Sequence, residues 1–270
     1  MSDRPPCIAR YERTIVGSLA DVWENVHDWE HLPWLHATSF RSIALLEAGE
    51  WGWRARVGLP ADGGSGDAAA PEVEIALRLR PGEEAYDVTT LSGPGEGTVI
   101  ATHLAAHGPE ETGVSVGFHL PGVGDDAAEM VGALYVSLYT RLWDEDQSMI
   151  EGRRRVTASP PPRVPAGARA DLGPREGLTL PHAFDLAGRR FQLVAHAGGL
   201  LAHDATCPHR GGTMRGEPDA QGRITCPWHG YCFDVASGRS ADGRGLRLAP
   251  APRIRIAADG RVEAVMEPAR

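Results

Sequence analysis

The chain has 270 residues and a formal net charge of −9, so we expect no nucleic acid as its main partner. Four cysteines are too few for a disulfide framework, which favours a reducing, cytoplasmic location. The first residues contain no apolar leader segment, and no apolar run approaches about 18 residues. We therefore expect no membrane span.

The first part of the chain, residues 1–156, predicts an α+β domain. Residues 8–16 alternate as a strand does, and Ser18 is placed to cap an amphipathic helix over residues 19–31. Residues 40–59 predict a hairpin that turns at 47–50, and residues 60–71 have the composition of a loop. We expect further strands at 72–80, 85–91, 97–106 and 113–120, and a long helix with an acidic first turn at 125–155. This series resembles the helix-grip, START-like fold, in which a curved antiparallel sheet wraps a long C-terminal helix and encloses a cavity.

Residues 157–176 are rich in proline and predict a linker between two domains. From residue 177 to residue 270 the pattern changes to short strands and glycine turns, which indicates an all-β domain. Asp259 and Gly260 stand between two alternating segments and predict a closing hairpin.

The all-β domain contains two short metal-binding patterns. Cys207 and His209 form C-x-H, and Cys226 and His229 form C-x-x-H. Two thiolates suit an iron that stays ferric, while two neutral imidazoles suit the iron that accepts the electron. The patterns resemble the Rieske [2Fe–2S] domain, and the resemblance implies that these four residues bind the cluster.

Structural zinc is the alternative, since two cysteines and two histidines also satisfy a zinc site. Zinc fingers, however, usually have two cysteines in one pattern and two histidines in the other, whereas each pattern here holds one Cys and one His. Gly211, Gly212 and Gly230 would also let the backbone approach a bulky cluster and direct N–H groups at its sulfurs. Quinol-oxidising Rieske proteins carry an extra, disulfide-bonded Cys in each loop. Those positions correspond to Gly212 and Trp228, which indicates the oxygenase or ferredoxin type.

A second constellation lies near the N-terminus, where Asp28, His31 and His36 form D-x-x-H-x-x-x-x-H. Two imidazoles and one carboxylate on one face of Fe(II) leave positions open for O₂ and substrate. Asp28 and His31 are three residues apart and would share a helix face. His31 and His36 would point about 140° apart on a straight helix, so we expect a break between them at Pro33.

The long helix offers three candidates for the carboxylate, namely Asp144, Glu145 and Asp146. The helical neighbours of Asp144 are polar and those of Asp146 are apolar, which places Asp146 on the buried face. A buried carboxylate is costly unless it is paired or binds a metal, so we choose Asp146.

These residues resemble the Rieske non-haem iron oxygenases, whose catalytic domain is also a helix-grip fold. The resemblance implies a mononuclear Fe(II) bound by His31, His36 and Asp146. In a head-to-tail trimer Asp28 would bridge His229 of one subunit to His31 of the next. The domain order is reversed relative to that family, which bears on this bridge and not on the cluster ligands.

Simpler interpretations remain open for the histidines. One of the two ligand candidates could be a hydrogen-bonded wall residue, and His27 with His31 forms an i, i+4 pair that could also attract a metal. His103, His107 and His119 lie on expected strands and could line the cavity. The tryptophans near the N-terminus indicate either packing or an aromatic-lined pocket.

Two functions follow from the sequence. The first is a Rieske oxygenase that receives electrons from a separate reductase or ferredoxin and uses O₂ to hydroxylate or demethylate a small apolar substrate, either aromatic or terpenoid-like. No nucleotide-binding fingerprint is present, so the flavin or NAD step would belong to that partner. The second is a ferredoxin-like electron carrier fused to a START-like domain that binds an apolar ligand without mononuclear iron.

Overall fold

A computed structural model of the chain describes residues 4–60 and 70–268. The chain divides into two compact units, Met1–Glu151 and Gly152–Arg270, and each is treated by itself. Most of the loop expected at residues 60–71 lies outside the described residues. In the described part, no helix is both long enough and apolar enough to span a membrane.

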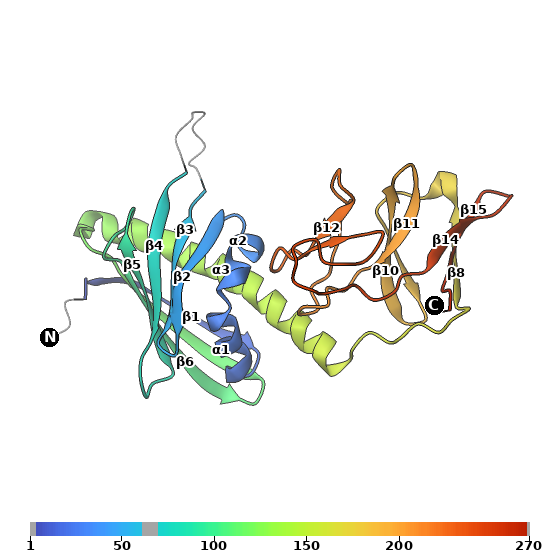
Figure 1. Ribbon diagram of the computed structural model, residues 1–270. Helices are drawn as coiled ribbons and strands as arrows, with labels where there is room; N and C mark the ends of the chain where they lie inside the picture. Colours follow the sequence, from blue (N-terminus) through green and yellow to red (C-terminus); the bar gives the residue numbers. More distant parts are fainter. Residues whose placement is uncertain (1–3, 61–69, 269–270) are drawn as a thin grey trace. The chain divides into compact units, whose positions relative to one another are not determined.

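The first unit is built on one antiparallel sheet of seven strands in the order β1-β7-β6-β5-β4-β3-β2 (Figure 1). Its strands are β1 (Cys7–Val16), β2 (Ser42–Gly49), β3 (Gly52–Gly58), β4 (Glu72–Leu79), β5 (Ala85–Ser92), β6 (Val99–Gly108) and β7 (Glu111–His119). Its helices are α1 (Leu19–His27), the 3-10 helix η1 (Trp29–His31), α2 (Leu32–Leu35) and the long α3 (Asp125–Ala158), which continues beyond Glu151.

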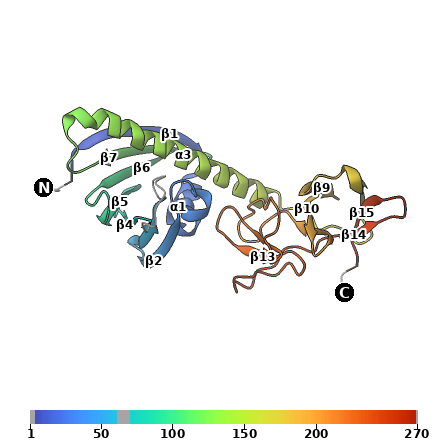
Figure 2. The ribbon, with the colours of Figure 1, turned by 90° about the horizontal axis from the view of Figure 1, so that it is seen from above.

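The core of this unit lies between the sheet and α3 (Figure 2). On β7 the buried residues Val114, Val116 and Phe118 alternate, as expected for one face of a strand. Trp143 and Ile150 come from the buried face of α3 and pack into the same cluster. The α+β class and the helix-grip architecture expected from the sequence are therefore confirmed.

Two local signals at helix starts are also confirmed. Ser18 caps α1 in a capping box, because its hydroxyl accepts from the Asp21 backbone N–H while the Asp21 carboxylate accepts from the Ser18 backbone N–H. The first turn of α3 is acidic, with Asp125 and Asp126 near the positive end of the helix dipole.

The helix expected over residues 19–31 is interrupted, and the interruption lies at Asp28. This residue leaves helical geometry (ψ 82°), so Asp28 and His31 do not share one helix face. The expected break at Pro33 is also wrong. Pro33 lies in the first turn of α2, where its missing N–H costs no helical hydrogen bond.

The second unit consists of short antiparallel strands. Two three-stranded sheets have the orders β11-β10-β9 and β14-β15-β8, and β12 pairs with β13. The strands are β8 (Arg169–Pro174), β9 (His182–Leu186), β10 (Arg189–His196), β11 (Gly199–Asp204), β12 (Arg223–Thr225), β13 (Cys232–Asp234), β14 (Arg253–Ile256) and β15 (Arg261–Val265), and a 3-10 helix, η2 (Arg175–Gly177), follows β8. The expected hairpin at Asp259 and Gly260 is present as β14 and β15.

The linker expected at residues 157–176 differs from the structure at both ends. Helix α3 continues to Ala158, and the second half contains β8, which pairs with β15. Proline content hid this strand, because the residues before it are rich in proline and Pro174, paired with Arg261, ends it. The unit has two apolar clusters, one between the two three-stranded sheets and one beneath the loops that bear Cys207 and Cys226.

Candidate metal centres

The two loops of the second unit that carry the C-x-H and C-x-x-H patterns have the same backbone closure. The N–H of Cys207 donates to the Gly212 carbonyl (2.8 Å), and its carbonyl accepts from the Gly211 N–H (3.0 Å). In the second loop, the N–H of Cys226 donates to the Tyr231 carbonyl (2.8 Å), and the Cys226 carbonyl accepts from the Gly230 N–H (2.9 Å). Gly211 and Gly230 have φ of +82° and +69°, so each loop needs glycine at its fourth position after the cysteine.

The two cysteine sulfurs lie together in the interior of this unit. A hydrogen bond between the two side chains raises the pKa of the Cys207 thiol, which burial raises further, and lowers the pKa of the Cys226 thiol. Backbone N–H groups of both loops are directed at the sulfurs and favour thiolate over thiol. They come from His209 and Arg210 in the first loop and from Trp228 and His229 in the second.

The two histidines of these loops lie next to each other, with ring centroids 4.7 Å apart. Tyr231 stacks on His209, at 4.1 Å and an interplanar angle of 8°. The Arg244 guanidinium covers the Tyr231 ring, 4.0 Å from its centroid, and donates to the Tyr231 hydroxyl at 2.7 Å. His209, Tyr231 and Arg244 therefore form a contiguous stack beside the cysteines, which sequence analysis did not anticipate.

Gly212 and Trp228 are neighbours, and these are the positions at which the resemblance would place the extra cysteines of quinol-oxidising Rieske proteins. A Cβ at Gly212 would lie 2.7 Å from the Cys226 sulfur and 3.0 Å from the Trp228 ring. The indole therefore occupies the space that a disulfide would need. Two cysteines, two histidines and converging N–H groups are a donor set that fits a [2Fe–2S] cluster.

The first unit brings His31, His36 and Asp146 together. All three are buried, and one ligand atom from each lies within 4.8 Å of the other two. The Nε2 atoms of His31 and His36 are 3.4 and 3.2 Å from Asp146 Oδ1. Within the part of the chain that the structure describes, this buried oxygen has no contact with hydrogen-bond geometry. Atoms that are each about 2.1 Å from a shared ion lie roughly 3 Å apart, so the arrangement fits a metal.

Two short helices, η1 and α2, and the long helix α3 place these ligand atoms. His31 ends η1 and precedes α2, while His36 follows the last residue of α2. The four-residue helix between them turns both side chains inward, although five positions separate them. Asp146 comes from the buried face of α3, as the apolar neighbours in its sequence predicted.

The electrostatics of this group favour a charged carboxylate. Burial opposes the charge on Asp146, but the imidazoles of His31 and His36 outweigh it and hold the pKa of this carboxyl well below its ordinary value. Burial likewise opposes a charged His36, yet Asp146 and Glu145 together raise its pKa. A bound divalent metal ion would supply the positive charge that a proton on His36 otherwise supplies beside these carboxylates.

Glu145 is the residue of this centre that sequence analysis missed as a participant. Its Oε2 lies 2.6 Å from His36 Nδ1, so it fixes the ring and leaves Nε2 for a metal. Asp144, the third candidate, binds Arg13 at 2.6 Å on the surface. Asp28 is half-buried and lies outside the group of three, and its expected link to a neighbouring subunit stays a prediction.

Tyr86, which is buried, and Tyr139, which is partly buried, lie within electrostatic reach of Asp146. Burial raises the pKa of Tyr86 and Tyr139, and the negative charge of Asp146 adds to the effect in both. Both phenols therefore stay protonated at neutral pH.

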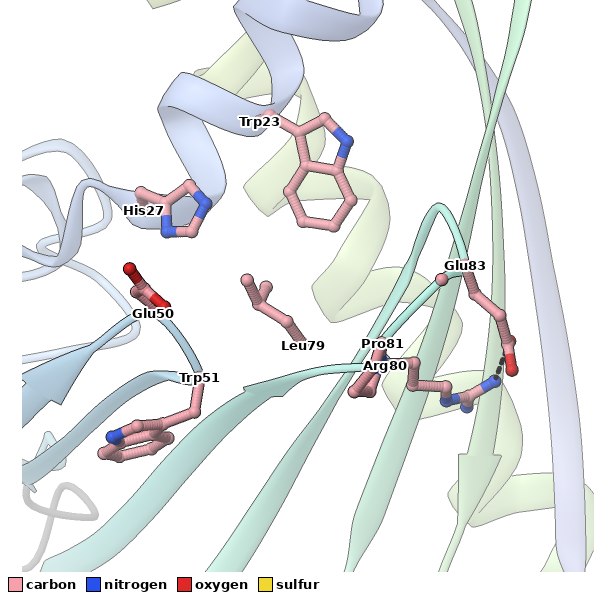
Figure 3. Close-up of a pocket in the computed structure, with 9 residues that line it drawn as sticks. Trp23, His27, Glu50, Trp51, Leu79, Arg80, Pro81 and Glu83 are labelled. Carbon is pink, nitrogen blue, oxygen red and sulfur yellow. Dashed lines mark ion pairs between the residues drawn. The ribbon is translucent and has the colours of Figure 1, made fainter.

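A pocket of about 420 Å³ opens between α1 and two turns of the sheet (Figure 3). It is lined by Trp23, His27, Glu50, Trp51, Leu79, Arg80, Pro81, Gly82 and Glu83. His103, His107 and His119 do not line it. His103 and His107 alternate with the buried face of β6 and are exposed, while His119 is 2.9 Å from the Pro5 carbonyl oxygen. Alternate residues of a strand point to opposite faces of the sheet, and the sequence did not say which face is buried. For this reason the expectation that these three histidines line the cavity was wrong.

Comparison with known proteins identifies the second unit. Residues 163–251 match the family model of the Rieske [2Fe-2S] domain. The second unit contains a Rieske [2Fe–2S] domain. Over 62 residues, 23% of this chain, the sequence is 36% identical to apoptosis-inducing factor 3 of Mus musculus and of Homo sapiens. The match spans 10% of the length of those proteins.

Solved structures similar to the first unit share little sequence with it. One is the Zhui aromatase/cyclase from Streptomyces sp. R1128, with 16% identity and a TM-score of 0.44 over 55% of this chain and 96% of that one. Another is a START superfamily protein from Mycobacterium smegmatis, with 16% identity and a TM-score of 0.43 over 53% of this chain and 96% of that one. The fold of the first unit rests on its own topology, given above.

Proposed function

We propose that this chain is a Rieske-type non-haem iron oxygenase. The observation that carries the proposal is the buried group of His31, His36 and Asp146, whose ligand atoms face one another on one chain with a Rieske domain. Two imidazoles and one carboxylate are the facial donor set of non-haem Fe(II) oxygenases. The Nε2 atoms of both imidazoles converge on the same buried carboxylate oxygen, at 3.4 and 3.2 Å, and such convergence is what a shared metal ion requires.

Each residue has a defined task in this proposal. Fe(II) bound by His31, His36 and Asp146 would supply O₂ activation, and a [2Fe–2S] cluster bound by the cysteines and histidines of the two loops would supply electrons. Glu145 accepts the Nδ1 proton of His36 and fixes its tautomer and orientation. Tyr86 keeps its proton and contributes a buried wall beside Asp146.

The proposal requires partners that a single chain does not supply. A separate reductase or ferredoxin would reduce the cluster, and the substrate would be a small, largely apolar molecule. A homo-oligomer, a trimer by resemblance to the oxygenases, would let Asp28 link centres of neighbouring subunits. The choice between hydroxylation and demethylation depends on the substrate.

The second candidate is an electron carrier fused to a ligand-binding helix-grip domain without mononuclear iron. The comparisons favour it directly, because the matched family covers only the Rieske domain of residues 163–251. In this alternative the raised pKa of His36 and the lowered pKa of Asp146 would describe a salt bridge that stabilises the fold.

The first experiment measures iron and acid-labile sulfide in anaerobically reconstituted protein. We expect about three iron per two sulfide in the wild type, and about two per two in the double variant His31→Ala/His36→Ala. The cluster accounts for two irons and the second centre for the third.

His103→Ala/His107→Ala is the matched control, because it removes two exposed histidines from the same unit. The control should keep the third iron. A ratio of two to two in wild type and variant alike would contradict the oxygenase proposal and leave the electron carrier.

A further inference from the structure

The pocket beside α1 has rigid aromatic walls. The Trp23 indole N–H donates to the Glu84 carboxylate, and its ring meets Tyr86 edge-on at 5.9 Å. Trp51 is covered on one side by the Arg78 guanidinium, 4.8 Å from the ring centroid. Figure 3 shows Trp23 projecting from α1 towards the space in which Leu79 also lies, with Trp51 at the far side. Such walls suit a flat or bulky apolar ligand.

The charges of this pocket are unequal. Arg80 is its only arginine in the described lining, and Asp87 and Glu83 neutralise it at 2.5 and 3.5 Å. Glu50 stands in the turn between β2 and β3 and forms no ion pair with any residue that the structure describes. Glu50 is exposed, and the Arg78 guanidinium over Trp51 does not belong to the lining. A bound ligand therefore meets the Glu50 carboxylate at the mouth of the pocket, which disfavours anionic ligands.

Two aromatic side chains, Trp23 and Tyr86, connect the pocket to the candidate iron centre. Trp23 forms its wall and packs against Tyr86, which lies within electrostatic reach of Asp146. These residues all belong to the first unit. A ligand held against Trp23 is thus one side chain away from the tyrosine wall of the centre.

We propose that this pocket binds an aromatic or similarly apolar molecule with a cationic amine, the amine lying near Glu50 and against the indole of Trp51. The inference rests on the proposed function, since this ligand would be its substrate. An ammonium group gains from a carboxylate and from an aromatic face, whereas a carboxylate ligand would meet repulsion from Glu50.

The test compares three probes that share the indole ring and differ in the end of the side chain: tryptamine, 3-ethylindole and indole-3-propionate. Isothermal titration calorimetry on the full chain measures their affinities. We expect tryptamine to bind about tenfold more tightly than indole-3-propionate, with 3-ethylindole between them. In Glu50→Gln this spread should fall to about twofold. Trp51→Leu should weaken tryptamine more than indole-3-propionate.

Glu47→Gln is the matched control, because it removes the same charge from β2, where Glu47 lies 4.0 Å from Arg54. It should keep the full spread, and circular dichroism should show that all variants are folded. Equal affinities for the three probes, tightest binding of the propionate, or an unchanged spread in Glu50→Gln would overturn the inference.

The two proposals fail separately. A third iron without cation preference would overturn the assignment of the pocket and leave the oxygenase. Cation preference in protein that has only two irons per two sulfides would support the pocket and remove the catalytic iron.

Discussion

At the scale of single residues, Glu145 is the least expected member of the candidate iron centre. Its carboxylate contacts His36 Nδ1 at 2.6 Å and holds the ring that would bind metal through Nε2. Glu145→Gln keeps the shape but removes the charge. We expect the affinity for the third metal to fall about tenfold, because partners of ligand histidines raise ligand basicity and fix orientation. Anaerobic titration with Fe(II) measures it.

Asp144→Asn is the control for this prediction, since Asp144 binds Arg13 on the surface of the same helix. It should leave metal affinity unchanged. Equal loss in both variants would mean that helix stability, rather than the contact with His36, controls the affinity.

The second prediction at this scale concerns Arg244, which covers the Tyr231 ring. It adds a positive charge to the stack on His209, and Asp242 at 3.4 Å balances part of that charge. A nearby cation stabilises the reduced, more negative cluster. We expect Arg244→Gln to shift the reduction potential negative, by an amount on the order of tens of millivolts. Protein-film voltammetry or a redox titration followed by EPR measures the shift.

Arg255→Gln removes the same charge from β14, at the other end of the unit, and should leave the potential nearly unchanged. A potential in Arg244→Gln that equals that of this control would contradict a role for the stack.

Residue patterns located the candidate ligands better than the residues that contact them. Asp146 could be chosen from the sequence because its helical neighbours are apolar, and the structure buries it. Glu145 has mixed neighbours, with Leu142 and Met149 beside Arg141 and Ser148, so helix periodicity gives it no clear face. Arg244 lies thirteen positions after Tyr231 in an irregular segment, and no local pattern joins them.

At the scale of elements, period and composition located most strands and the long helix, because each has one buried and one exposed face. They did not locate the break at Asp28. The run from Leu19 to His31 keeps its amphipathic character through η1, so hydrophobic spacing alone continues the helix. The actual geometry depends on packing against the sheet.

Strand β8 is an element that the composition of the sequence hides. Its sequence, RADLGP, follows a proline-rich stretch and resembles a linker by composition. Pairing with β15 makes it a strand, and that partner is about ninety positions away. Non-local pairing of this kind leaves little trace in a single sequence, because strand propensity depends on the neighbouring strand.

At the scale of the whole molecule, each candidate metal centre belongs to one unit. His31, His36 and Asp146 come from Met1–Glu151, and the four residues of the Rieske loops come from Gly152–Arg270. Each unit also has an apolar core of its own. Residues with no shared partners contribute nearly independently to stability and binding. The two centres should therefore form independently of each other.

Complementary double variants test this independence. Cys207→Ser/Cys226→Ser should abolish the cluster EPR signal and leave the affinity of the first unit for Fe(II) within about twofold of wild type, because none of its ligands is changed. His31→Ala/His36→Ala should lose the third metal and keep the cluster signal. Metal titration and EPR on the same preparations measure both. Loss of Fe(II) binding in the cysteine variant would contradict independence and would mean that the cluster domain must be assembled before the first unit can bind its metal.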